Sequence, residues 1–148
     1  MHNRNMEQLH TLKFEERIAA TPEKVWSVLW EDDTYRRWTS VFAVGSYAES
    51  DWKEGSEIRF LSPEGSGMLS VIDRRVENEL MVFKHLKDII KGELKDTSWT
   101  GATESYELIR SDGDTLLVVE LQSTEVPLTY FKETFPKALK LVKELSLA

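Results

Sequence analysis

Residues 127–148 read PLTYFKETFPKALKLVKELSLA, and this stretch decides the fold. Its apolar side chains recur every three or four residues, which is the spacing that places them on one face of an α-helix. The positions on this face are Leu128, Phe131, Phe135, Leu139, Val142 and Leu145. We therefore predict one long amphipathic helix at the C-terminus. Pro136 lies within this pattern and removes one backbone hydrogen bond, so we expect a kink near residues 132–135.

The preceding stretch, residues 44–125, has the pattern of short strands separated by turns. Between the turn signals, apolar residues alternate with polar ones, as in Met81, Phe83 and His85 on one face of a single strand. The sequence Asp112-Gly113-Asp114 indicates a tight hairpin, because glycine tolerates the positive φ of such a turn. These segments predict an antiparallel sheet whose strands are apolar on one side.

The N-terminal part of the chain indicates a strand followed by two helices. Residues 8–20 alternate loosely, and Thr21-Pro22 then supplies a cap and a first helical residue for a helix that runs to about Trp30. Asp32 or Asp33 offers the cap of a second, shorter helix. The predicted order is therefore a strand, two helices, six strands and a helix. The fold class is α+β, with a curved antiparallel sheet of about seven strands wrapped around the long C-terminal helix.

Length and composition narrow the class of protein. A chain of 148 residues is expected to form one domain, with residues 1–7 as a loosely ordered N-terminal segment. Cysteine is absent, so disulfides and thiolate metal sites are excluded, and a cytoplasmic location is expected. The net charge of −7 would repel phosphate backbones and anionic membranes on average, and no apolar run suits membrane insertion.

Several local motifs resemble the SRPBCC superfamily, the helix-grip fold of START lipid-transfer domains and birch-pollen-type allergens. Within it the chain is most similar to the branch named for activators of heat-shock-protein ATPase. The matching residues are Thr21-Pro22-Glu23-Lys24-Val25-Trp26, Trp52 with Glu54-Gly55-Ser56, Gly67-Met68, Phe83-Lys84-His85-Leu86, Trp99 with Gly101-Ala102, Glu104, Tyr106 and Leu108, and Tyr130-Phe131 with Phe135-Pro136-Lys137-Ala138-Leu139.

This resemblance implies the helix-grip fold and an apolar cavity between the sheet and the terminal helix. Members of the superfamily variously bind lipids, carry hydrophobic metabolites, or act as cyclases and hydrolases. In the eukaryotic co-chaperone, a separate N-terminal domain contacts the chaperone, and 148 residues leave no space for one. We therefore do not expect chaperone activation from this chain.

The residues expected to bind a ligand are mainly aromatic, since aromatic rings supply wide apolar contact area. Rings from the sheet and from the terminal helix should face each other across the space between them. Together with two polar candidates, the predicted ligand-binding residues are Phe60, Phe83, His85, Trp99, Glu104, Tyr106, Phe131 and Phe135. Plain core packing is the alternative interpretation for each aromatic residue by itself.

Alternation places two titratable residues, His85 and Glu104, on the inner face of the sheet. His85 either is a structural histidine satisfied by a neighbour or takes part in the site. Glu104 shares a face with Tyr106 and Leu108 and would be costly to bury without a partner. It either meets Tyr106, His85 or a lysine, or faces a ligand at the cavity mouth, or is turned into solvent by a bulge.

The leading hypothesis is a protein that binds a small hydrophobic ligand and is not an enzyme. A second hypothesis is a cyclase or hydrolase in which His85 and Glu104 act as acid and base. A third is a protein-interaction or co-chaperone-like module. We expect no cofactor, no metal site and no nucleic-acid partner, and either a monomer or a homodimer.

Overall fold

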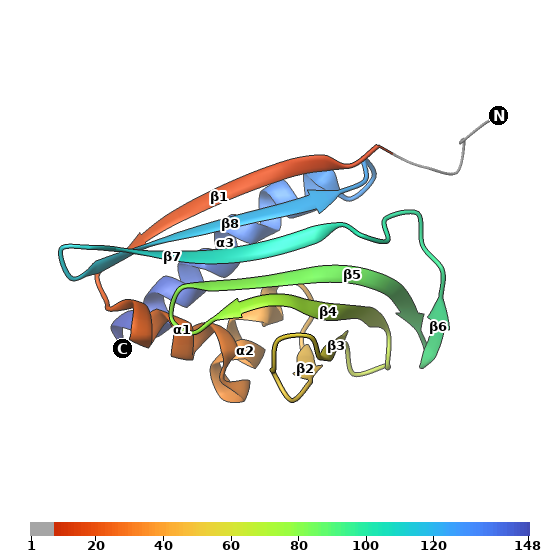
Figure 1. Cartoon of the computed structure of the whole chain (residues 1–148), viewed down its shortest axis with the longest axis horizontal. Coiled ribbons are helices and arrows are strands. Elements are labelled where there is room, and N and C mark those ends of the chain that lie inside the picture. Colours follow the sequence, from red (N-terminus) through yellow and green to blue (C-terminus); the bar gives the residue numbers. More distant parts are fainter. Residues whose placement is uncertain (1–7) are drawn as a thin grey trace.

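A computed structural model describes residues 8–148, in which one antiparallel sheet packs against a long C-terminal helix (Figure 1). The predicted α+β class and helix-grip arrangement are confirmed. The N-terminal segment 1–7, expected to be loosely ordered, lies outside the described residues. The elements in chain order are β1 (His10–Ile18), α1 (Pro22–Trp30), α2 (Asp32–Trp38), the 3-10 turn η1 (Thr39–Val41), β2 (Tyr47–Glu49), β3 (Glu57–Leu61), β4 (Gly67–Val76), β5 (Leu80–Ile90), β6 (Glu93–Lys95), β7 (Thr103–Ser111), β8 (Asp114–Ser123) and α3 (Leu128–Leu147).

The sheet runs in the order β1-β8-β7-β5-β4-β3-β2, with β1 and β2 at its two ends. This path contains the seven strands that the sequence predicts, and the three-residue β6 pairs with β5 as an eighth. β7 and β8 are joined by the expected hairpin, in which Asp112 and Gly113 form a two-residue turn with φ values of 50° and 86°. Positive φ at both residues matches the right-handed twist of the flanking strands.

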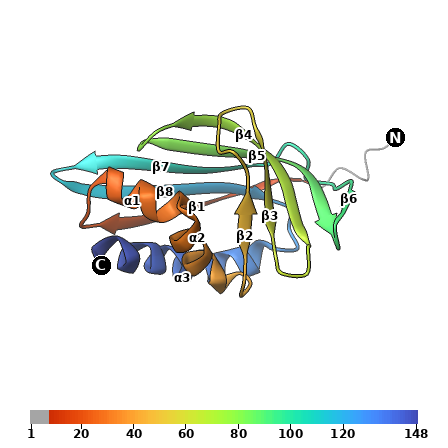
Figure 2. The same ribbon diagram turned by 90° about the horizontal axis from the view of Figure 1, so that it is seen from below.

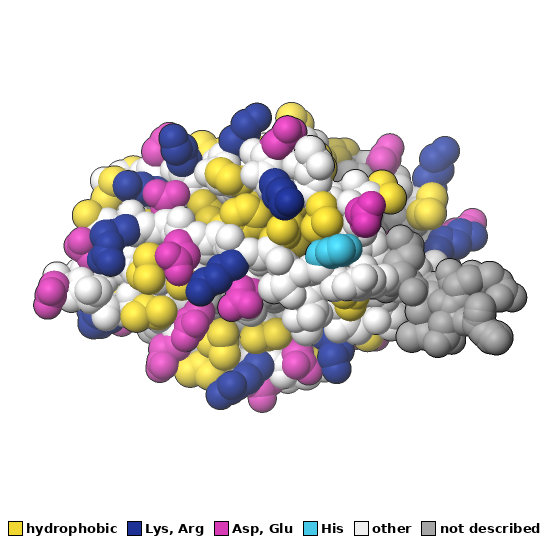
Figure 3. Space-filling model, turned by 90° about the horizontal axis from the view of Figure 1, so that it is seen from above, with side chains coloured by type: hydrophobic (Ala, Val, Ile, Leu, Met, Phe, Trp, Pro, Cys, Tyr) yellow, Lys and Arg dark blue, Asp and Glu magenta, His cyan; other side chains and the backbone are white. Residues whose placement is uncertain are grey.

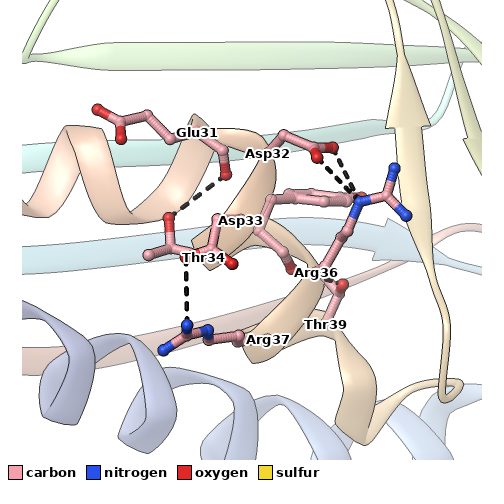
Figure 4. A network of polar contacts seen from close by, with 8 residues as sticks. Glu31, Asp32, Asp33, Thr34, Arg36, Arg37 and Thr39 are labelled. Atoms are coloured by element: carbon pink, nitrogen blue, oxygen red, sulfur yellow. Dashed lines mark hydrogen bonds and ion pairs between the residues drawn. The ribbon is translucent and has the colours of Figure 1, made fainter.

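The start of α1 agrees with the sequence, whereas the start of α2 does not. Thr21 accepts a hydrogen bond from the backbone N–H of Lys24 at 3.2 Å and so caps α1. The residue before α2 is Glu31, so the prediction that Asp32 or Asp33 is the cap was wrong. Both aspartates lie inside the first turn instead. There they pair with the arginines four residues later, Asp32 with Arg36 and Asp33 with Arg37 (Figure 4).

The three helices and the inner face of the sheet share one hydrophobic core. α1 contacts β7 and β8, and both α1 and α2 contact α3 (Figure 2). The predicted apolar face of α3 is confirmed, since Phe135, Leu139 and Val142 are buried. α3 continues through Pro136 as a single helix, and the kink stays a prediction.

The outer surface is mixed in charge on the side shown in Figure 3, where acidic and basic side chains of the described residues alternate with hydrophobic ones. No helix in residues 8–148 has the length and apolar character needed to cross a membrane.

Candidate functional site

A cavity of about 280 Å³ lies between the inner face of the sheet, the α2–η1 segment and the first half of α3. Most of its wall is apolar and aromatic. All eight residues predicted to bind a ligand line this one cavity, namely Phe60, Phe83, His85, Trp99, Glu104, Tyr106, Phe131 and Phe135. The structure therefore brings together residues from four strands or loops of the sheet and from α3.

Strand register explains why the residues from β5 and β7 meet. Residues that pair across antiparallel strands share one face of the sheet. Phe83 on β5 pairs with Glu104 on β7, and Met81 pairs with Tyr106. Glu104 also pairs with Leu121 on β8, which lines the same cavity. Glu104 thus points inward, and the alternative in which a bulge turns it into solvent was wrong.

The Glu104 carboxylate is held by a tyrosine from its own strand. The Tyr106 hydroxyl donates a hydrogen bond to Oε2 of Glu104. Burial raises the pKa of Glu104, and the hydrogen bond from Tyr106 acts in the opposite direction. Burial and then the nearby charge of Glu104 raise the pKa of Tyr35, another residue of the cavity wall. Two features of the alternatives for Glu104 are therefore combined. The carboxylate accepts a hydrogen bond from Tyr106, and it also lines the cavity.

His85 is 4% exposed and is fixed by two neighbours. Its Nε2 lies 3.1 Å from Oδ1 of Asp88, and its ring stacks on Trp99 with centroids 3.8 Å apart. A carboxylate only accepts hydrogen bonds, so the ring proton is on Nε2, and Nδ1 is a buried acceptor for which the described residues supply no partner. Burial lowers the pKa of His85, and Asp88 opposes this effect.

A β-bulge explains how Asp88 reaches His85 although the two are three residues apart on one strand. His85 pairs with Ser70 on β4, but Lys87 pairs with Leu69, so Leu86 has no partner residue on β4. One inserted residue reverses the alternation of side chains beyond it. Asp88 therefore joins the face that carries His85.

The loop after β6 places Trp99 over His85. The backbone N–H of Gly101 donates to the carbonyl of His85 at 2.8 Å, and the hydroxyl of Thr100 donates to the carbonyl of Leu86 at 3.0 Å. Both contacts anchor the loop to the middle of β5. Trp99 is thus positioned by backbone hydrogen bonds rather than by a strand.

Sequence reasoning missed part of the wall, which comes from the helices and the turn between them. Trp30 contacts Tyr106 and Phe83 edge to face, with ring centroids 4.9 and 5.4 Å apart, and its Nε1 is buried without a partner among the described residues. Tyr35 and Phe42 also line the cavity. The spacing of Trp26 with Trp30 and of Tyr35 with Trp38 signals an inward helix face and could have identified two of these residues.

One side of the cavity is formed where α3 meets the turn after η1. Phe42 packs edge to face on Phe135 with ring centroids 4.9 Å apart, and the Tyr130 hydroxyl donates to the carbonyl of Phe42 at 3.1 Å. Tyr130 is 45% exposed and Phe131 is half-buried. These contacts join the first half of α3 to the helical segment across from it.

The overall structure is similar to several solved ones. One is the Aha1 dimer from Colwellia psychrerythraea, with 18% identity, a TM-score of 0.71 and coverage of 91% of this chain and 94% of that one. Protein MLL2253 from Mesorhizobium loti has 17% identity, a TM-score of 0.70 and coverage of 92% and 96%. CalU16 from Micromonospora echinospora has 16% identity, a TM-score of 0.63 and coverage of 91% and 73%. At these identities the similarity shows the fold.

Sequence comparison identifies the family. No curated protein sequence matches the chain. The family described as Activator of Hsp90 ATPase homolog 1-like protein matches residues 19–141, which include α1, every strand except β1, and most of α3. The chain therefore belongs to the Activator of Hsp90 ATPase homolog 1-like family.

Proposed function

We propose that this protein binds a small hydrophobic molecule in the cavity between the sheet and α3. The observation that carries the proposal is an aromatic wall contributed by sheet and helices around a space of about 280 Å³, with Glu104 and Tyr106 as a polar group within it. Ligand pockets typically combine an apolar lining with a few polar groups that orient the ligand.

The volume of the cavity limits the size of the ligand. The cavity volume of about 280 Å³ lies just below the roughly 300–1,000 Å³ that is usual for ligand pockets. A molecule with one or two fused rings, or a short chain, suits this space better than a long-chain phospholipid does.

Native mass spectrometry of protein isolated gently from its own cells tests this proposal, together with thermal unfolding in the presence of small aromatic metabolites. A bound ligand raises the melting temperature because it binds only the folded state. We expect Phe131→Ala to weaken that stabilisation and Leu145→Ala to leave it unchanged, since both residues are half-buried on α3 but only Phe131 lines the cavity. A protein that carries no bound mass and responds to no compound would contradict the proposal.

General acid–base catalysis is a second candidate function, favoured by one observation. Glu104 and His85 line the same cavity, on adjacent strands. Catalysis would convert a bound compound into a new one, so incubation followed by chromatography distinguishes it from binding. Recovery of every bound compound unchanged would argue against it, whereas turnover that is lost in both Glu104→Gln and His85→Gln would support it.

A further inference from the structure

We propose that the ligand carries a positively charged nitrogen, such as a protonated amine, and that the Glu104 carboxylate pairs with it. This inference rests on the proposed ligand-binding function and concerns the chemistry of the same cavity. The residues around Glu104 supply three independent reasons, which concern charge balance, the aromatic rings and the exclusion of anions.

Charge balance is the first reason. Among the described residues that line the cavity there is no lysine or arginine, and Glu104 forms no ion pair with any described residue. Among the described residues, the only side-chain hydrogen bond to Glu104 comes from Tyr106. A carboxylate has about four lone-pair sites, so most of its acceptor capacity is left for a ligand in the cavity that it lines. Carboxylates removed from bulk water are stabilised by pairing with a cation, and none of residues 8–148 supplies one to Glu104, so a ligand cation would fill this role.

The surrounding rings supply the second reason. Trp30, Phe83 and Tyr106 are in mutual contact, with ring centroids 4.9 to 6.3 Å apart, and all three line the cavity together with Glu104. The faces of aromatic rings carry partial negative charge and attract cations, most strongly when the cation is desolvated. A carboxylate within an aromatic enclosure is therefore suited to a cation attached to an apolar group.

The same wall disfavours an anionic ligand. A fatty acid or aromatic acid would place a second negative charge near Glu104 in a space of low polarity, where like charges repel strongly. His85 does not offset this repulsion, because burial lowers its pKa and keeps the ring neutral at neutral pH. The cavity thus discriminates by charge among ligands of one shape.

Three probes with the same naphthalene ring test this inference: 2-naphthylmethylamine, 2-naphthylmethanol and 2-naphthoic acid. Their affinities are measured by isothermal titration calorimetry at pH 7.4, where the first is a cation, the second neutral and the third an anion. We expect the amine to bind at least about 10-fold more tightly than the alcohol, a difference of about 1.4 kcal/mol, and the acid to bind most weakly.

Two variants separate the role of Glu104 from the general negative charge of the protein. Glu104→Gln keeps the side-chain shape and an acceptor for the Tyr106 hydroxyl, and it should remove the preference for the amine over the alcohol. The matched control is Glu107→Gln, which removes an equal charge from the exposed face of the same strand. This control should retain the full preference.

The outcomes distinguish this inference from the proposed function. Binding of the alcohol or the acid as tightly as the amine would overturn the inference while supporting a hydrophobic ligand site. A preference for the amine that survives in Glu104→Gln would also overturn it, because the cation would then be bound elsewhere. Absence of binding by all three probes overturns the inference as well, and counts against the proposed function only if the wider compound panel is also negative.

Discussion

The two halves of α3 carry the same apolar stripe but meet different surroundings. In the C-terminal half, Ala138, Leu139 and Val142 are 0%, 1% and 0% exposed, and this end of the helix lies beside α1 (Figure 1). In the N-terminal half, Tyr130 and Phe131 are partly exposed and line the cavity. Helical periodicity shows which side chains point toward the sheet. It does not show whether the space opposite is filled.

The largest expected loss of stability is in the C-terminal half of α3. Leu139→Ala removes a fully buried side chain from close-packed surroundings and should lower the free energy of unfolding by about 2–5 kcal/mol. Urea denaturation measures this change. A loss below 1 kcal/mol would show that the C-terminal half is as loosely packed as the cavity end, and the contrast between the two halves would fail.

A smaller loss of stability is expected in the N-terminal half of α3, which lines the cavity. In a tight core, Phe131→Ala would cost about 3–5 kcal/mol, but Phe131 borders open space, so we expect a loss of about 1 kcal/mol. The same urea experiment provides the comparison with Leu139→Ala. A loss above 3 kcal/mol would mean that the ring packs as firmly as a core residue.

Substitution of Glu104 is expected to increase the stability of the protein, in contrast to the two preceding variants. Burial raises its folded-state pKa above the ordinary value of 4.5, so its contribution to stability is fully present below about pH 4.5 and is lost as the pH rises through the folded-state pKa. Glu104→Gln should therefore stabilise the unliganded protein at pH 7.5, on the order of 1 kcal/mol, and the gain should shrink toward pH 4.5. Thermal unfolding across this pH range, with Glu107→Gln as control, measures the effect.

A destabilising Glu104→Gln variant at pH 7.5 would contradict this expectation, since it would make Glu104 a structural residue. A stabilising variant that binds ligand poorly would be the signature of a residue retained for function at the expense of stability.

The smallest expected change in stability comes from the titration of His85. Burial lowers its folded-state pKa below about 6.5, so the unfolded state binds a proton more readily, and stability should fall as the pH drops from about 6.5 through the folded-state pKa. Titration of the imidazole by NMR should give a midpoint below 6.5. A midpoint above 6.5 would show that Asp88 outweighs burial.

The sequence predicts the sheet, the hairpin at Asp112 and the inward faces of β5 and β7, because these depend on local periodicity and turn chemistry. It does not predict the pairing of His85 with Asp88. That pairing requires the bulge at Leu86, and nothing in the local sequence marks it. The contribution of Phe42 to the cavity wall is also missed, since a residue in a turn has no periodic pattern and is placed by tertiary packing alone.

The position of β1 at the end of the sheet bears on aggregation. Its outer backbone edge has no strand partner among residues 8–148, and such an edge is a template for pairing with other chains. Along this strand every second residue is exposed, and three of these are Lys13, Glu15 and Arg17. Charged side chains on an edge strand discourage unwanted strand addition. β1 therefore combines an apolar face that supports α3 with a charged face that protects the free edge.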